Sequence, residues 1–386
     1  MNVSVYSSPE ELDRIAELWD RAAPESPHAS RGLFTLVTRT QRDAGTSGYV
    51  AVLEDPARDP IVVVGRVERR PLLVKAGYRT LLSVPARWLT IVAGGILGAR
   101  TADDHASVVA ALQRALRRDV DVIEFGKIAV DGPEHRAVLA HVPWYRRGQA
   151  GPPQGHHRAG LADGFEAYQA ARSRNTRQRT RRRLRRLEDA SARMEVRRVG
   201  SDDDSAVVAK TLDEITAHSY QRGIGAGFAL DDLHRTLVSW AVEGGPFRIW
   251  ILSVRGVPAA YLSGLVHART FFLFDTAFDP TFSDDEPGGI LMAAVLQALA
   301  GDPDIDAFDF AFGDAQYKQS LGDESWDEVD LFVFAPRPRA LVLNAARGGA
   351  AACVAAAKRL LGGERIAALR RRMRSQLSES GPAEAD

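Results

Sequence analysis

The chain is 386 residues long, 45% hydrophobic and 26% charged, which is typical of a globular protein too long for one ordinary core. Its 50 basic and 50 acidic side chains give a formal net charge of zero, so overall electrostatics argue neither for nor against nucleic acid. The single cysteine, Cys353, excludes an internal disulfide framework and suits a reducing compartment. Acidic residues interrupt the start of the chain, so we expect no signal peptide and a cytoplasmic protein.

The first 150 residues predict a helix, a group of strands, and then a further helix and strand. Ser8 can cap the first helix, Pro9 suits its first turn, and Glu11 stands at the capping-box position. The later elements are expected at Gly48–Leu53, Ile61–Val67, Leu81–Val84, Ala106–Leu116 and Val120–Phe125. We therefore assign residues 1–150 to an N-terminal lobe.

Residues 151–200 are predicted to hold a linker and a basic helix. Gly, Pro, His and Arg dominate residues 146–160, which are the best linker candidate, and a helix is expected over roughly 165–190. The stretch from Arg172 to Arg186 holds nine arginines. A solvated helix is the ordinary explanation of such a run, but its density also favours the phosphates of a nucleotide-linked or lipid-linked precursor, or tRNA. Arg179 and Arg183 are the candidate contacts.

Residues 201–336 predict a second lobe built on a three-stranded meander. Helices are expected after the acidic cap at 201–204 and from Asp231 onward. The expected strands are Phe247–Val254, Pro258–His267 and Phe271–Phe278, followed by an acidic loop, the helix Ile290–Ala300, and the strands Ala307–Phe312 and Val329–Phe334. Residues 337–386 predict a basic helical tail, which can lie on an anionic membrane or can simply pack on the protein.

The two halves of the chain share one order of elements: an aspartate pair, a helix rich in Ala and Leu, and a strand with an acid before Phe. The pair is Asp103-Asp104 in the first half and Asp284-Asp285 in the second. This echo predicts two lobes derived from one unit. The first lobe lacks Pro-Gly-Gly and Tyr-Lys, so we expect it to be the degenerate one.

Four short motifs in the second half give a more specific indication. They are Pro287-Gly288 at the head of a helix, the strand Asp309-Phe310-Ala311-Phe312-Gly313, the pair Tyr317-Lys318, and Gly322. Together with the meander and the basic helix, these motifs resemble the GNAT-like family that includes CelD-type acetyltransferases, and they are similar to the FemABX peptidyl-transferases. The resemblance covers about residues 165–335, and it covers the first lobe by layout only. It implies an α/β (α+β) fold of two GNAT-like lobes, each a mixed, mostly antiparallel sheet flanked by helices.

The resemblance also implies a place for the acyl donor, acyl-coenzyme A. A helix N-terminus exposes unpaired N–H groups, and glycines let a pyrophosphate approach them, so Pro287, Gly288 and Gly289 are the candidate cofactor-binding residues. Asp284, Asp285 and Glu286 precede them and are expected to repel a phosphate. The alternative is a helix whose start is simply stabilised by acidic residues.

Asp275 is the candidate proton acceptor. Strand alternation places it on one face with Phe271, Leu273 and Ala277, where an apolar environment would raise its pKa or demand a partner. It could deprotonate an attacking amine or hydroxyl, or it could bond turn backbone at the strand end. Asp309 on a neighbouring strand is a second candidate, with a structural carboxylate as the favoured alternative.

Tyr317 and Lys318 are the candidate electrophilic residues. A lysine or tyrosine can stabilise the negative charge that develops on a carbonyl oxygen, and a tyrosine can protonate the leaving thiolate. The resemblance implies that Lys318 belongs to the site. Tyr220 and Arg222 could line the acceptor pocket.

These residues favour transfer of an acyl group from acyl-coenzyme A to an amine or hydroxyl of a small or lipid-linked cell-envelope or polysaccharide precursor. One alternative is a FemABX-like transfer that depends on aminoacyl-tRNA, which the arginine run favours. Another is a non-catalytic adaptor in envelope-polymer assembly. The sequence holds no metal-ligand spacing, P-loop, nucleophile elbow or dinucleotide fingerprint, so we expect no metal.

Overall fold

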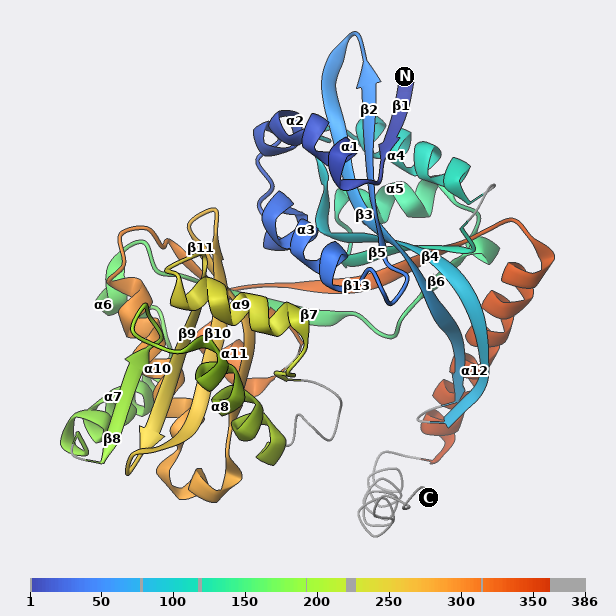
Figure 1. Cartoon of the computed structure of the whole chain (residues 1–386). Coiled ribbons are helices and arrows are strands. Elements are labelled where there is room, and N and C mark those ends of the chain that lie inside the picture. The colour runs from blue at the N-terminus through green and yellow to red at the C-terminus, as the bar shows by residue number, and fades with distance from the viewer. Residues whose placement is uncertain are drawn as a thin grey trace, which may run out of the picture.

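The computed structural model describes residues 2–76, 79–116, 120–191, 193–219, 227–313 and 315–361. Its strands form one 13-stranded mixed sheet that passes through two lobes (Figure 1). The strand order is β1-β2-β3-β4-β5-β13-β7-β12-β11-β10-β9-β8, and β6 pairs with β13. The predicted fold of two GNAT-like lobes is confirmed. Among the described helices, none has the length and apolarity needed to cross a bilayer.

The N-terminal lobe is built on the β1–β5 half of the sheet. Ser8 caps the first helix and Glu11 completes the capping box, as predicted. Its elements are β1 (Asn2–Tyr6), α1 (Pro9–Arg14), α2 (Ala16–Arg21), η1 (Pro27–Ala29), α3 (Arg31–Thr40), β2 (Ser47–Asp55), β3 (Arg58–Ala76), β4 (Arg79–Leu97), α4 (Ala102–Ala115), β5 (Val122–Ala129) and α5 (Pro133–His141). Strands β3 and β4 are much longer than predicted, because charged residues near position 69 continue the pairing instead of ending it.

The C-terminal lobe holds the predicted helices and meander. Its elements are α6 (Gly164–Ala170), α7 (Arg174–Asp189), β8 (Met194–Arg198), α8 (Ser205–His218), α9 (Asp232–Val242), β9 (Phe247–Val254), β10 (Val257–His267), β11 (Thr270–Phe278), η4 (Pro280–Asp285), α10 (Pro287–Ala300), β12 (Ala307–Phe312), α11 (Gln316–Leu321) and β13 (Glu324–Phe334). Helix α10 packs on one face of this half of the sheet. Helices α8 and α9 pack on the other, where Leu33 and Leu36 from α3 of the first lobe join their core.

The predicted recurrence of one helix–strand order in both halves is confirmed in the topology. In the first lobe four antiparallel strands, β1–β4, are followed by α4 and by β5, which lies parallel to β4. In the second lobe β8–β11 are followed by α10 and by β12, which lies parallel to β11.

The predicted linker at residues 146–160 is wrong. This segment follows η2 (Trp144–Arg146) and forms two strands, β6 (Arg147–Gln149) and β7 (Gln154–Gly160), inside the sheet. Its Gly- and His-rich sequence has weak strand propensity, so the pairing of β7 between β12 and β13 decides its conformation.

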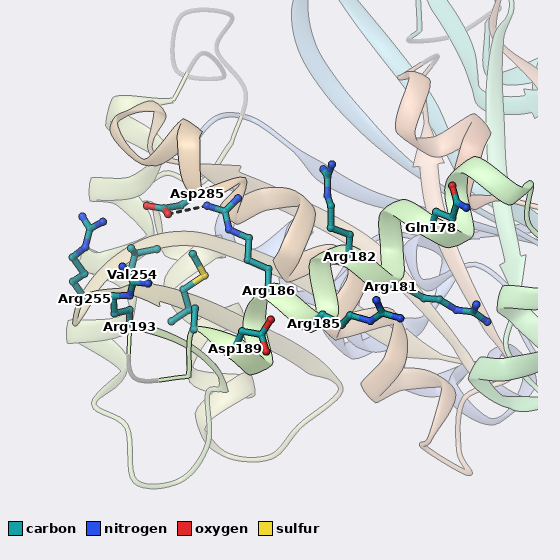
Figure 2. Close-up of a pocket in the computed structure, with 12 residues that line it drawn as sticks. Gln178, Arg181, Arg182, Arg185, Arg186, Asp189, Arg193, Val254, Arg255 and Asp285 are labelled. Carbon is teal, nitrogen blue, oxygen red and sulfur yellow. Dashed lines mark hydrogen bonds and ion pairs between the residues drawn. The ribbon is translucent and has the colours of Figure 1, made fainter.

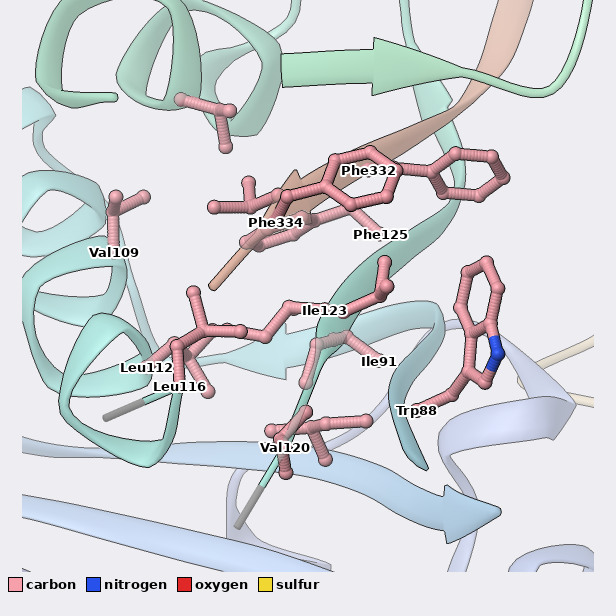
Figure 3. Packing of buried hydrophobic residues seen from close by; sticks show 14 of the residues in the cluster. Trp88, Ile91, Val109, Leu112, Leu116, Val120, Ile123, Phe125, Phe332 and Phe334 are labelled. Atoms are coloured by element: carbon pink, nitrogen blue, oxygen red, sulfur yellow. The ribbon is translucent and has the colours of Figure 1, made fainter. Parts of the chain in front are cut away.

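Strand β13 belongs to both lobes. Glu324–Glu328 pair with β7, whereas Val329–Phe334 pair with β5 of the first lobe. Phe332 and Phe334 of this second half pack in the first lobe's core with Phe125 (Figure 3). The helix α12 (Pro338–Leu361) then returns along β3. The lobes therefore do not divide at one point in the sequence.

Candidate active site

The parallel pair β11–β12 is hydrogen-bonded over only part of its length. Pairing runs from Thr270–Phe272 against Ala307–Asp309, while β11 continues to Phe278 and β12 to Phe312. Beyond Phe272 on β11 and Asp309 on β12, the backbone N–H and C=O groups of the two strands are therefore not paired with each other. Such an interruption inside a sheet leaves a place where a ligand can reach backbone N–H and C=O groups.

A β-bulge in β11 changes the side on which Asp275 lies. Leu273 pairs with Gly264 and Asp275 with Ser263, so Phe274 between them has no partner on β10. Phe271 and Leu273 pack in the core under α10, whereas Ala277 packs in the core under α8 and α9. The prediction that Asp275 shares a face with Phe271 and Leu273 is therefore wrong, because a bulge inverts the alternation beyond it.

Asp275 is held in a buried hydrogen-bond network. The hydroxyl of Tyr261, a fully buried residue, donates to the Asp275 carboxylate, and the Thr276 N–H donates to Oδ1 at 2.8 Å. The Tyr261 hydroxyl also lies 3.0 Å from Thr216 Oγ1 and accepts from the Phe228 N–H at 3.3 Å. Burial raises the pKa of Asp275 and outweighs these hydrogen bonds.

The end of β12 is bound from two sides by Asp309 and Lys318. Ala311 lies in the left-handed region with φ 58°, which produces a bulge opposite β7. Asp309 Oδ1 accepts from the Ala311 N–H at 2.7 Å. Lys318 Nζ donates to the carbonyls of Ala311 at 3.3 Å and Phe312 at 2.9 Å, and the residue is only 9% exposed. Tyr317 precedes it on α11 and is 38% exposed, with its ring edge-on to Phe310.

A half-buried histidine, His156, extends this cluster and was not predicted from the sequence. Its Nε2 lies 2.7 Å from Asp309 Oδ1, and its Nδ1 lies 3.0 Å from Glu328 Oε1. The ring stacks on Trp326, whose indole N–H donates to Glu328. Burial disfavours the charged imidazole, but the bonds to Asp309 and Glu328 prevail and raise the pKa of His156 to about 9. His156 could not be predicted as a site residue, because the segment Gln154–Gly160 lacks the alternation of apolar and polar residues that indicates a strand.

The start of α10 carries the predicted glycines and is covered by arginines of α7. A Cβ on Gly288 would lie 3.3 Å from the Phe278 ring, so this helix start packs against the end of β11. The absent side chain of Gly289 leaves room for the guanidinium of Arg183. Pro287 has no N–H, and the Gly289 N–H donates to the Glu286 carbonyl at 3.1 Å, so the Gly288 N–H and the adjacent guanidinium are the groups here that favour an anion.

Two of the acidic residues before α10, Asp285 and Glu286, are paired with these arginines. Glu286 bonds Arg182 at 2.8 Å and Arg183 at 3.2 Å, and Asp285 bonds Arg186 at 3.1 Å. These ion pairs hold the pKa of Glu286 below its usual value, against the effect of burial. The expected repulsion of a phosphate is therefore partly offset, because Glu286 and Asp285 have positive partners and Arg186 donates to the Asp284 backbone carbonyl.

Beside this helix start lies an open hollow of about 870 Å³, and half of its lining residues are arginines (Figure 2). Its arginines come mainly from one side of α7, and Asp189 and Asp285 are the lining carboxylates. The lining arginines are Arg181, Arg182, Arg185, Arg186, Arg193 and Arg255. Arg183, one of the two predicted contacts, does not line this hollow but forms an ion pair with Glu286 beside it. Arg179, the other, is exposed on α7 and does not line the hollow either.

A second cavity, of about 290 Å³, lies where the parallel pair β4–β5 of the first lobe stops at Ile91 and Phe125. Leu33, Phe34 and Val37 of α3 form an apolar wall. The polar lining consists of His28, Arg66, Thr90, Glu124, Lys127 and Asp330. Lys127 Nζ bonds Asp330 at 2.8 Å and lies 3.5 Å from the centre of the Phe312 ring, so this cavity borders the end of β12.

His28 is the unusual residue of this cavity. Its side chain is exposed to solvent and lines the cavity. Desolvation and the charge of Arg66 lower the pKa of His28, with Asp309 of the other lobe opposing them. The imidazole is therefore neutral near pH 7 and can accept a proton.

Tyr220 and Arg222 lie outside the described residues. Of the other predicted residues, Asp309, Tyr317 and Lys318 come together at the end of β12, and Pro287, Gly288, Gly289 and Arg183 come together at the start of α10. Asp275 lies on β11 among side chains of α8 and β10. The missed residues are His156, Glu328 and His28.

Comparison with known proteins agrees with this architecture. Residues 174–319, less than half of the chain, match the model of a family described as an acetyltransferase (GNAT) domain. The fold is similar to that of FemX, with a TM-score of 0.54 and 11% identity over 82% of this chain and 95% of that one. It is also similar to a tandem GNAT protein from the clavulanic acid biosynthesis pathway, with a TM-score of 0.51 and 14% identity over 87% and 99%.

A conserved protein of unknown function from Bacteroides thetaiotaomicron VPI-5482 is similar as well, with a TM-score of 0.50 and 14% identity over 83% and 97%. A search of the curated proteins finds no significant match. At these identities the solved structures establish the fold: two GNAT-like lobes in one chain, the second of which contains the matched acetyltransferase domain.

Proposed function

We propose that the protein is a GNAT-type acyltransferase whose C-terminal lobe moves an acyl group from acyl-coenzyme A to an amine or hydroxyl. The observation that carries this proposal is the coincidence of three features at one end of β11 and β12. Their pairing stops, a helix start with two glycines packs against β11, and a buried lysine binds the end of β12. The acceptor class, a cell-envelope or polysaccharide precursor, is the one implied by the resemblance to CelD-type and FemABX proteins.

The donor pyrophosphate would bind at Pro287, Gly288 and Gly289. Arg182 and Arg183 would exchange Glu286 for the phosphates, since both side chains already bond a carboxylate at this helix start. Further phosphate of the donor would lie in the arginine-lined hollow next to it. The thioester would then extend toward the interrupted part of the β11–β12 ladder.

The chemistry would be a direct attack within a ternary complex. The acceptor nitrogen or oxygen forms a bond to the acyl carbon, the bond to the thiolate sulfur breaks, and the nucleophile's proton passes to the protein. Lys318 would stabilise the negative charge on the acyl oxygen, and Tyr317 would protonate the leaving thiolate. Cys353, the single cysteine, is exposed on α12 and serves no covalent intermediate in this scheme.

Two groups compete for the role of proton acceptor. Asp275 has a raised pKa, which suits a base near neutral pH, but its carboxylate already accepts from Tyr261 and Thr276. His28 offers an accessible neutral imidazole in the cavity at the end of β4 and β5. We propose Asp275 as the proton acceptor, with His28 as the alternative.

An aminoacyl-tRNA donor is the second candidate, and the arginine-lined hollow favours it. Closely spaced guanidinium groups on an exposed helix suit a polyphosphate backbone as well as a coenzyme. Calorimetry distinguishes the two donors: we expect acetyl-coenzyme A to bind the native chain and to bind Arg183→Gln about tenfold more weakly. Absence of acetyl-coenzyme A binding, together with salt-sensitive binding of aminoacyl-tRNA, would replace the first donor with the second.

A further inference from the structure

The parallel ladders of the two lobes end in the same way. Pairing of β5 with β4 stops at Phe125, and pairing of β12 with β11 stops at Asp309. Two residues beyond each of these ends the backbone enters the left-handed region, at Lys127 with φ 51° and at Ala311 with φ 58°. Residues other than glycine rarely adopt this conformation, and it persists only where the surroundings fix it.

An aspartate fixes each of these left-handed residues through its backbone N–H. Asp309 Oδ1 accepts from the Ala311 N–H at 2.7 Å, and Asp330 Oδ1 accepts from the Lys127 N–H at 2.9 Å. Asp330 also binds the Lys127 ammonium group, through Oδ2 at 2.8 Å. The Asp330 carboxylate therefore fixes both the backbone of Lys127 and the direction of its side chain.

The side chain of Lys127 reaches from the first lobe to the second. Its Nζ lies 3.5 Å from the centre of the ring of Phe312, which follows Ala311 at the end of β12. A cation over an aromatic ring is an attractive contact that strengthens as water is excluded, and both of these residues are half-buried. The end of β12 is therefore in direct contact with a residue of β5.

Two lysines, one from each lobe, hold Phe312. Lys127 contacts its ring, and Lys318 Nζ donates to its carbonyl at 2.9 Å. Because ring and carbonyl belong to one residue, a shift of the ring changes the position of the carbonyl that the Lys318 ammonium group binds. In the proposed reaction Lys318 stabilises the charge on the acyl oxygen, and a misplacement of about 1 Å at such a group can slow a reaction by about 10²-fold.

We propose that Lys127 is a positioning residue for the C-terminal lobe. Held by Asp330, it fixes the ring of Phe312 and, through that residue, the orientation of Lys318. This role rests on the proposed function, and it gives the first lobe a part in the transfer that the second lobe carries out. Since Lys127 acts through Phe312 and not on the donor, its loss slows the chemical step and leaves donor affinity unchanged.

Hydrogen exchange of the full chain, followed by mass spectrometry, tests the contact without turnover. We expect β12 to exchange at least about fivefold faster in Lys127→Met and in Phe312→Leu than in the native protein. Phe312→Leu keeps the ion pair of Lys127 with Asp330, so it separates loss of the ring contact from loss of a charge. Lys210→Met is the matched control: this exposed lysine of α8 pairs with Glu214 at 3.6 Å, and its loss should leave β12 unchanged.

Release of thiol from acetyl-coenzyme A, with hydroxylamine as a small acceptor, tests the positioning. Lys127→Met and Phe312→Leu should each lower kcat by about tenfold and leave the KM for acetyl-coenzyme A unchanged. Lys127→Arg keeps a cation for the ring and for Asp330, so its kcat should lie within about twofold of the native value. The double variant Lys127→Met/Phe312→Leu should be no slower than Lys127→Met, since both changes remove one contact.

Equal protection of β12 in the native protein and in Lys127→Met overturns the proposal, whatever the rates are. Faster exchange with an unchanged kcat also overturns it, because the contact then stabilises the strand without positioning Lys318. Rate losses that multiply in the double variant do the same, since Lys127 and Phe312 then act separately. A native chain that releases no thiol contradicts the proposed function itself, and the exchange of β12 then decides alone whether Lys127 holds Phe312.

Discussion

His156 Nε2 lies 2.7 Å from Asp309 Oδ1, and this pair joins β7 to β12 beside the bulge that Lys318 also binds. The same ring reaches Glu328 on β13, so one imidazole connects three strands where the two lobes meet. The raised pKa of His156 means that the folded protein keeps this ring charged at neutral pH. The junction between the lobes is therefore sensitive to alkaline conditions.

We predict that stability falls as the pH rises from neutrality toward about 9. A histidine with a raised pKa contributes fully below its unfolded value of about 6.5, and the contribution is lost as the pH passes through the folded value. The shift corresponds to roughly 3 kcal/mol. Urea unfolding across this range should show a slope in native protein that His156→Gln lacks. Parallel curves for the two proteins would mean that the histidine is not charged in the fold.

Replacement of Asp275 by asparagine should lower the transfer rate by about 10²- to 10⁴-fold, as expected for loss of a general base. Asparagine keeps the shape, but its one oxygen can accept from Tyr261 or from the Thr276 N–H and not from both, so unfolding should change by about 1 kcal/mol. Tyr261→Phe is the stability control, because it removes the hydrogen bond from the Tyr261 hydroxyl but keeps the Asp275 carboxylate. If Asp275→Asn retains full activity, the carboxylate is structural and the role of base passes to another residue.

His28 can be separated from Asp275 by its pH profile. Because desolvation and Arg66 lower the pKa of His28, a His28 base would give an acidic limb in kcat/KM below pH 6.5. His28→Gln should then abolish this limb and slow transfer, without changing affinity for acetyl-coenzyme A. A limb that survives in His28→Gln assigns the proton to Asp275.

Lys318→Met should reduce transfer by about 10²- to 10³-fold through loss of charge stabilisation. It should also cost about 1–3 kcal/mol of stability, because two carbonyls at the end of β12 lose their donor. Lys318→Arg is the matched variant for charge. An intact cellular phenotype in a folded Lys318→Met protein, combined with loss of phenotype when the α7 arginines are neutralised, would indicate a non-catalytic adaptor.

Glu286 should compete with the donor. Its carboxylate bonds Arg182 and Arg183, so Glu286→Gln should free both guanidinium groups and tighten acetyl-coenzyme A binding severalfold in calorimetry. Glu188→Gln on the exposed side of α7 removes an equal charge and should have little effect. Weaker donor binding in Glu286→Gln would show that the carboxylate holds Arg182 and Arg183 in position for the donor and does not compete with its phosphate.

Much of the second lobe followed from sequence because local signals and tertiary structure agree there. The three meander strands begin and end within one residue of their predicted bounds, Pro287 and Gly288 open α10, and the Asp-Phe strand leads into Tyr317 and Lys318 as predicted. The side of the sheet on which Asp275 lies could not be predicted, because a bulge at Phe274 depends on the pairing with β10 and leaves no mark in the residue pattern.

The junction between the lobes was hidden for a related reason. The segment around Gly155 and His156 resembles a loop when taken alone, and only its position between β12 and β13 makes it a strand. The His156 cluster and the His28 cavity are assembled from residues more than a hundred positions apart. Spacing in the sequence predicts contacts within one helix or strand, so it could not indicate these pairs.

The shared strand β13 has a consequence for how the protein is made. Phe332 and Phe334 complete the core of the first lobe, yet they follow β8–β12 of the second lobe in the chain, so the ribosome adds them later. The core of the N-terminal lobe is therefore completed only after the strands of the second lobe have been synthesised. Separate expression of either lobe would leave an open sheet edge where the other half should be.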